Sequence, residues 1–132
     1  MSNIKPVQIE NSISKYLKPL ELENVKTKDI KTVSYLNLEC LMYTGQGYKD
    51  YIKVSNWSEG RKDFGNWHLL QKTQELIKCF VEEIGNEYLI LKFKNTSNEY
   101  RGTYMHIKLA IQFAQWISPK FAFKVSELVE AH

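Results

Sequence analysis

The chain has 132 residues, of which 43% are hydrophobic and 25% charged, as in a single soluble globular domain. No uncharged stretch is long enough to span a bilayer and the start of the sequence carries no secretion signal, so we expect an intracellular protein. Cys40 and Cys79 could in principle form a disulfide, but without a secretion signal two reduced thiols are favoured. The cysteines fit no metal-ligand spacing with the three histidines, so no zinc site or other cofactor is predicted.

The net charge of +3 is small, but the basic residues are unevenly distributed. Between Tyr88 and Lys124 a single acid, Glu99, opposes six basic residues: Lys92, Lys94, Arg101, Lys108, Lys120 and Lys124. A one-sided positive stretch suits a polyanionic partner. The alternative is a solvated basic face without a partner, because a count along the chain does not show that the charges share a surface.

Residues 1–30 are polar and show no long periodicity, so they are predicted to form an N-terminal arm with little regular structure. A short helix is expected around Ser12–Leu17. The rest of the chain, residues 31–132, is predicted to be the folded domain. Its first part, Lys31–Val54, is rich in strand formers, and the Gly45-Gln46-Gly47 sequence indicates a hairpin turn.

Residues 64–84 have apolar side chains at helical spacing, and Gly85-Asn86 is typical of a helix C-terminus. Thr73 is an alternative cap for a second helix after a short first one. Residues 87–94 alternate as a strand does, residues 95–99 are turn formers, and a second short strand begins near Tyr100. Together they predict a hairpin with a polar tip and basic flanks.

The last part of the chain predicts two helices, 107–117 and 119–130, separated by Ser118 and Pro119. Serine can accept a hydrogen bond from a free amide of the next turn, and proline is tolerated at the first helical position. Two helices joined this closely must meet at a wide angle, which is the geometry of a helix-turn-helix corner. Compact packing of two helices is the alternative. The inner faces are predicted to carry Leu109, Ala110, Phe113, Trp116, Ile117, Phe121, Ala122, Val125, Leu128 and Val129.

Residues 102–129 resemble the C-terminal half of the KilA-N domain. That pattern runs Gly-Thr-Trp-Val-His-Pro, then Leu-Ala, then Ala-x-Trp-x-Ser-Pro-x-Phe-Ala and a valine. The matching residues here are Gly102, Thr103, His106, Leu109, Ala110, Ala114, Trp116, Ser118, Pro119, Phe121, Ala122 and Val125. Upstream, YIKVSNW, GRKDFGNW and TQELI resemble further segments of the family. Departures occur at Lys53, Asn56, His68 or Leu69, Tyr104 and Ile107.

The resemblance implies a DNA-binding module of large DNA viruses and phages with a fold similar to the APSES domain. We therefore expect an α+β fold of small β-hairpins packed on helices, winged-helix-like, with the helix-turn-helix corner at 107–130. In a viral protein the location would be the host cytoplasm, at virus factories, or the nucleus. In poxvirus host-range proteins this domain precedes a RING domain. The two cysteines of the present sequence are too few to build a RING domain.

Basic side chains predict phosphate contacts to double-stranded DNA, with RNA as an alternative partner. The candidate DNA-binding residues are Arg61, Lys62, Lys72, Lys92, Lys94, Arg101, Lys120, Lys124, Asn66 and His68. The polar side chains that could read bases are Asn66, His68, Gln71 and Asn98. The rings of Trp67, Phe113, Trp116 and Phe121 are candidates for base stacking, but helical spacing favours core positions. No catalytic constellation is present, so no enzyme is predicted. The second hypothesis is a protein-interaction or substrate-recruiting module, and a homo-oligomer is compatible with either.

Overall fold

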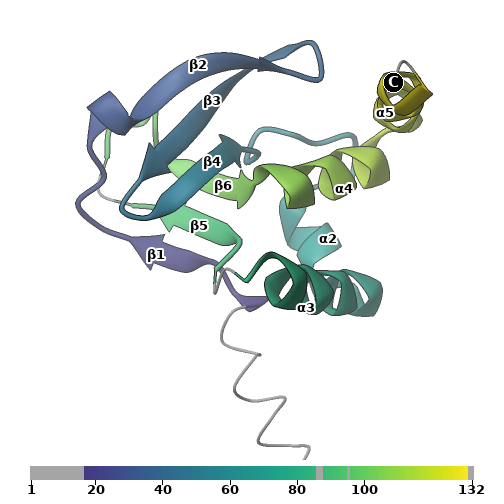
Figure 1. Cartoon of the computed structure of the whole chain (residues 1–132), viewed down its shortest axis with the longest axis horizontal. Helices are drawn as coiled ribbons and strands as arrows, with labels where there is room; N and C mark the ends of the chain where they lie inside the picture. Colours follow the sequence, from purple (N-terminus) through teal and green to yellow (C-terminus); the bar gives the residue numbers. More distant parts are fainter. Residues whose placement is uncertain (1–16, 86–87, 95, 131–132) are drawn as a thin grey trace, which may run out of the picture.

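A computed structural model describes residues 17–85, 88–94 and 96–130, without the side chains of residue 125 and residues 128–130. The predicted helix around Ser12 and the inner-face positions of Val125, Leu128 and Val129 therefore lie outside the described part. The strands, labelled in Figure 1, are β1 (Leu20–Leu22), β2 (Ile30–Tyr35), β3 (Leu38–Gly45), β4 (Tyr48–Lys53), β5 (Ile90–Phe93) and β6 (Gly102–His106). The α-helices, also labelled there, are α2 (Phe64–Leu69), α3 (Gln71–Ile84), α4 (Ile107–Ile117) and α5 (Pro119–Glu130), and a 3₁₀ helix, η2 (Thr27–Asp29), precedes β2. The fold is α+β, as the sequence predicted.

The described strands form one sheet in the order β1-β5-β6-β4-β3-β2. β1 runs parallel to β5, with Leu20 opposite Leu91, and the other neighbours are antiparallel. The sequence predicted an irregular arm as far as residue 30, whereas residues 20–22 already belong to the sheet. Three residues are too few to give a strand signal, and β1 is held by its pairing with β5 and by its two leucines.

Two hairpins build the long side of the sheet. The predicted turn at Gly45-Gln46-Gly47 is confirmed, and Gln46 and Gly47 have positive φ values of 51° and 88°. A second turn, between β2 and β3, was not predicted. Its residues Leu36 and Asn37 have φ values of 53° and 64°. Two left-handed residues match the twist of a two-residue hairpin, but leucine in such a turn gives no sequence signal.

The helices α2, α3 and α4 cover one face of the sheet (Figure 1). Residues 64–84 are two helices, as the alternative of a short first helix and a second one predicted, because Leu70 is extended, with ψ at 139°. The alternative cap, Thr73, is wrong, since Leu70 precedes α3 and Thr73 is buried within it. The predicted end of α3 is confirmed: Gly85 adopts the left-handed conformation at φ 80°.

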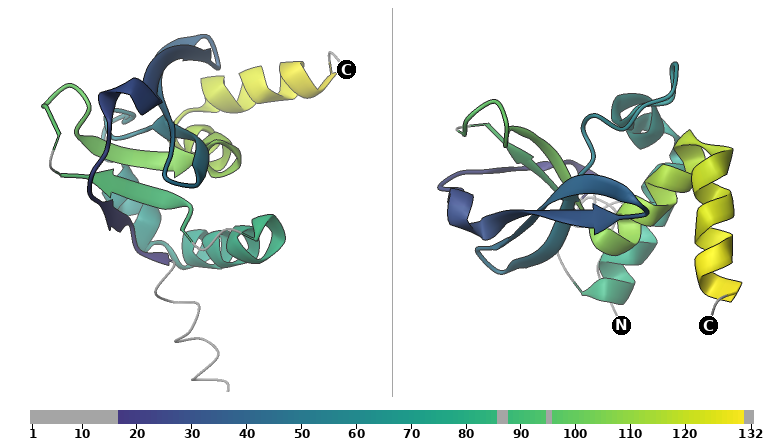
Figure 2. Two further views of the ribbon diagram at one scale, coloured as in Figure 1. Left: turned by 60° about the vertical axis from the view of Figure 1, so that its left-hand side comes forward. Right: turned by 90° about the horizontal axis from the view of Figure 1, so that it is seen from above.

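The opposite face of the sheet carries a second apolar cluster. Its fully buried rings are Tyr43, Tyr51 and Tyr104, with Phe93 stacked on Tyr104 at 4.1 Å between ring centroids. All six strands contribute side chains to this cluster. The sheet is strongly twisted, as the two views in Figure 2 show.

Ser118 separates α4 from α5 in the predicted way. It is extended, at φ −143° and ψ 127°, and its Oγ accepts a hydrogen bond from the Lys120 backbone N–H at 3.2 Å. At the start of α4, His106 Nδ1 accepts from the Lys108 N–H at 3.1 Å. The corner directs α5 away from the sheet (Figures 1 and 2). The winged-helix arrangement implied by the resemblance stays a prediction.

The Ser118 cap can be tested with a second serine as control. Ser118→Ala removes a buried cap and should lower the free energy of unfolding by about 1 kcal/mol in urea denaturation. Ser126 lies inside α5, where its Oγ donates to the Ala122 carbonyl. Ser126→Ala should change stability by less than about 0.5 kcal/mol, because alanine favours a helix interior. Equal losses in the two variants would contradict the capping role.

Candidate nucleic-acid interface

The predicted DNA-binding cations separate into two groups at opposite ends of the molecule. Lys92, Lys94 and Arg101 belong to the β5–β6 hairpin, which lies at the left of Figure 1, whereas Lys120 and Lys124 lie on α5 at the right. Both views of Figure 2 keep these ends apart. The basic residues between Tyr88 and Lys124 therefore do not form one face. β6 and α4 lie between these hairpin residues and α5 in the chain and place the two groups at opposite ends of the molecule.

At the hairpin end, several cations already bind groups of the same chain. Lys94 forms a salt bridge with Glu21 at 2.8 Å, with both side chains more than half exposed. The hydrogen bond and charge of Lys94 lower the pKa of Glu21. Arg101 Nη2 donates to the Thr96 carbonyl at 3.3 Å. Exposed pairs of this kind are weak, and DNA could compete for them.

The other end carries a set of residues that we call the corner surface. It is made of Asn37 of the β2–β3 turn, Lys120, Phe123 and Lys124 of α5, Lys62 beside Trp116, and Arg61, the chain neighbour of Lys62. Lys62 Nζ lies 5.7 Å from the Trp116 ring centroid, next to the α4–α5 corner. A shallow depression of about 490 Å³ joins the β2–β3 turn to α5 and is lined by Asn37, Pro119, Lys120, Phe123, Lys124 and Glu127. Among described residues, no carboxylate lies within salt-bridge distance of the four cations of this surface.

The polar candidates on α2 have structural partners. The side chain of Asn66 donates to the Arg61 carbonyl at 2.6 Å, and its backbone N–H donates to the Asp63 cap at 2.9 Å. His68 hydrogen-bonds the Leu17 carbonyl and stacks on Phe64 at 5.2 Å. Both residues thus hold chain segments in place, and base contacts would require these bonds to open. Lys72 is exposed in the first turn of α3.

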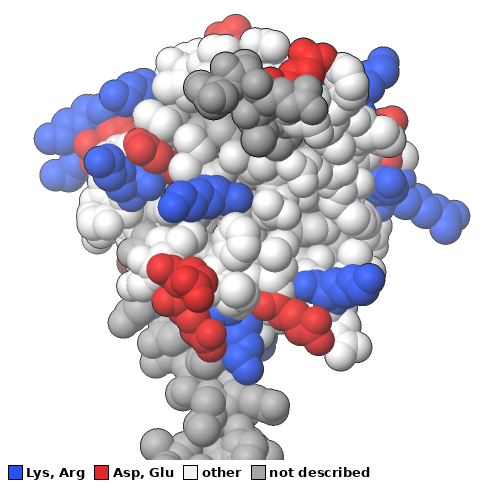
Figure 3. Space-filling model, turned by 45° about the vertical axis from the view of Figure 1, so that its right-hand side comes forward, with Lys and Arg blue, Asp and Glu red and all other residues white. Residues whose placement is uncertain are grey.

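Figure 3 shows how charge is distributed on one face of the molecule. Lysine and arginine side chains lie near its margins with acidic side chains among them, and a broad uncharged area lies between. This face carries no dense patch of one sign.

The aromatic candidates mostly lie in the core. Trp67 and Phe113 are buried, at 3% and 0% exposure, and Trp116 and Phe121 are half-buried. The exposed ring is instead Phe123, at 65%, which the sequence analysis did not single out. Phe123 lies two positions beyond Phe121 and therefore off the apolar stripe of α5. This position in the sequence could have predicted that its ring is exposed.

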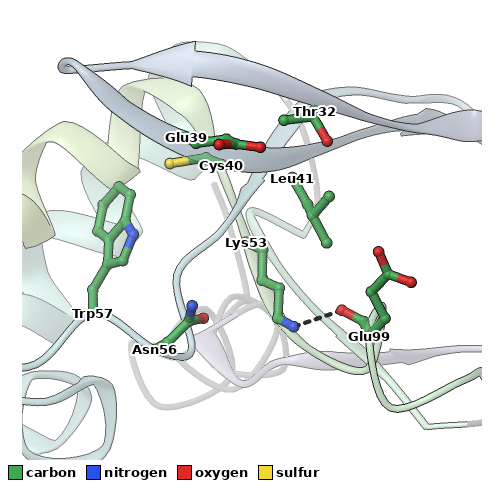
Figure 4. Close-up of a pocket in the computed structure, with 8 residues that line it drawn as sticks. All are labelled: Thr32, Glu39, Cys40, Leu41, Lys53, Asn56, Trp57 and Glu99. Atoms are coloured by element: carbon green, nitrogen blue, oxygen red, sulfur yellow. Dashed lines mark hydrogen bonds between the residues drawn. The ribbon is translucent and has the colours of Figure 1, made fainter.

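The sequence analysis also missed a groove beside Trp57. Two adjoining depressions of about 360 and 340 Å³ share Glu39, Asn56 and Trp57 in their linings. Figure 4 shows the larger one, between the β2–β3 hairpin and the segment that follows β4. Lys53 and Asn56, two positions that depart from the KilA-N pattern, line it. Lys53 Nζ donates to the Glu99 carbonyl at 3.0 Å.

Comparison with protein families gives a match to the KilA-N domain over residues 33–132. The chain belongs to the KilA-N domain family. Two KilA-N domain-containing proteins of Acanthamoeba polyphaga mimivirus are 28% identical over 99 residues and 34% identical over 101 residues. These alignments cover 73% and 71% of this chain but 29% and 28% of the relatives. No solved structure matches.

This KilA-N domain spans less than a third of those viral relatives. Within the described residues, no helix is long and apolar enough to cross a membrane. Over the same residues, no group of three or more metal-ligating side chains comes together. Cys40 and Cys79 are both free, and Cys40 is buried.

The His106 cap gives a pH-dependent prediction. Burial lowers the pKa of His106, and nearby Lys108 lowers it further, against an opposing effect of Asp50. The unfolded chain therefore takes up a proton at higher pH than the folded domain, and stability should fall as pH drops from about 7.5 to about 5.5. His106→Asn keeps a capping acceptor and should flatten this part of the curve in urea denaturation. An unchanged slope would contradict the assignment.

Proposed function

We propose that this domain binds double-stranded DNA through phosphate contacts, made mainly by the corner surface. KilA-N domains of viral proteins are generally DNA-binding. The observation that carries the proposal is a set of cations near the α4–α5 corner: Lys62 beside Trp116, Arg61 next to it in the chain, and Lys120 and Lys124 on α5. Among described residues, none of them lies within salt-bridge distance of a carboxylate.

Phosphate binding by such a surface is driven by counterion release, so affinity should fall steeply with salt. Each phosphate contact contributes about −0.9 to the slope of log affinity against log salt. Four cations therefore support a slope of about −3 to −4. The exposed ring of Phe123 lies between Lys120 and Lys124 on α5 and is placed to contact sugar or base edges.

The hairpin end has a smaller part in this proposal. Lys94 is paired with Glu21, and Arg101 is bound to a backbone carbonyl, so DNA must displace these contacts before it gains new ones. Lys92 is exposed next to them and offers one further phosphate contact.

Two matched charge reversals test the proposal. Lys62→Glu, Lys120→Glu and Lys124→Glu together should weaken duplex binding more than about tenfold and reduce the salt slope by about 2 to 3. The control combines Lys92→Glu, Lys94→Glu and Arg101→Glu, with the same change in net charge, and should weaken binding less than about threefold. Fluorescence anisotropy of a labelled duplex across salt concentrations measures both.

Comparing the two triple variants separates the effect of a local contact with DNA from the effect of the net charge of the protein. Equal losses in the two triple variants would mean that only net charge matters. A larger loss in the hairpin variant would move the interface to β5 and β6. Wild-type protein that fails to bind duplex at low salt would contradict DNA binding by this domain.

A further inference from the structure

The groove beside Trp57 has both apolar and polar lining residues. It adjoins the corner surface, because Lys124 Nζ lies 5.9 Å from the Phe121 ring centroid and the backbone of Glu59 pairs with that of Lys62. Its smaller depression is lined by Leu38, Trp57, Ile117 and Phe121 together with polar groups of the segment that follows β4. The larger depression continues past Cys40 and Leu41 toward Thr32 on β2, an edge strand of the sheet. The groove therefore extends from an edge of the sheet to the first turn of α5, a path suited to an extended segment.

Trp57 is held in a fixed position within this groove. Its ring stacks on Tyr35 at 5.9 Å and on Phe113 and Phe121 at 6.2 Å each, with interplanar angles of 12°, 13° and 25°. The Cys40 thiol lines the same groove, and burial raises its pKa, against an opposing effect of the Trp57 side chain. A ring fixed from several sides offers a binding partner a surface that needs little further ordering.

The rim of the groove is acidic. Glu39, Glu59 and Glu99 line it and are all exposed. In the described part of the chain, no lysine or arginine lies within salt-bridge distance of their carboxylates. The single lysine in the lining, Lys53, donates its hydrogen bond to the backbone carbonyl of Glu99. In Figure 4, Glu39 and Glu99 come from different parts of the chain and border the same hollow.

We propose that this groove binds an extended basic peptide segment of a protein partner. Arginine or lysine stems would pack along Trp57, Ile117 and Phe121 while their charged ends reach Glu39 and Glu59. The amide of Asn56 can both donate to and accept from a peptide backbone. Nucleic acid is disfavoured here, because phosphates would face three carboxylates, of Glu39, Glu59 and Glu99, against one lysine of the lining, Lys53.

The test uses two synthetic peptides, acetyl-Ala-Arg-Leu-Arg-Ala-amide and the same peptide with glutamate in place of arginine. Binding is followed by the NMR signal of the Trp57 indole N–H, in a chain with three tryptophans. The basic peptide should shift this signal in a saturable way and leave that of Trp116, outside the groove lining, unchanged. The acidic peptide should produce no shift.

Matched variants show whether the rim charges are responsible. Glu39→Gln with Glu59→Gln should weaken binding of the basic peptide at least about fivefold. Glu75→Gln with Glu82→Gln removes the same charge from exposed positions of α3 and should change it less than about twofold. No saturable Trp57 shift, equal binding of both peptides, or equal losses in the two double variants would overturn the proposal. A Trp57 shift by a DNA oligonucleotide that competes with the peptide would do so as well, by assigning the groove to nucleic acid.

Discussion

The burial of Phe113 is the interaction on which the rest of this domain depends. This ring of α4 is fully buried and contacts Trp67 at 4.9 Å and Phe64 and Trp57 at 6.2 Å each. It thereby joins α4 to α2 and to the segment that follows β4. Removing a buried phenylalanine from a core costs about 3–5 kcal/mol, a large part of the 5–15 kcal/mol that stabilises a typical domain.

Both proposed surfaces depend on this aromatic cluster. Through Trp57 it reaches Phe121 and so fixes the first turn of α5, where Ser118 caps the helix and Lys120 lies, one turn before Lys124. Through Trp57 it also reaches Tyr35 and shapes the groove under the β2–β3 hairpin. The proposed DNA surface and the proposed peptide groove therefore share one set of rings, since Phe121 lines the groove and its ring centroid lies 5.9 Å from Lys124 Nζ.

The elements with strong local signals could be predicted from the sequence. The Gly-Gln-Gly turn, the β5–β6 hairpin, the end of α3 at Gly85 and the Ser118 corner depend on backbone preferences of a few adjacent residues. β1 and the Leu36-Asn37 turn could not, because tertiary pairing holds them against weak local preference. The candidate cations were readable as residue types, but their separation into two ends required the order of strands in the sheet. The groove beside Trp57 could not be predicted either, because Glu39, Trp57 and Phe121 are far apart in the sequence and only the fold brings them together.

The most direct test of the central claim is NMR mapping of backbone amides during titration with a short DNA duplex at low salt. We expect the largest shifts at Arg61, Lys62 and residues 119–124, and smaller shifts in the β5–β6 hairpin. Added salt should reverse both sets of shifts. Shifts centred on residues 92–101, with the α4–α5 corner unchanged, would contradict the assignment of the corner surface as the DNA interface.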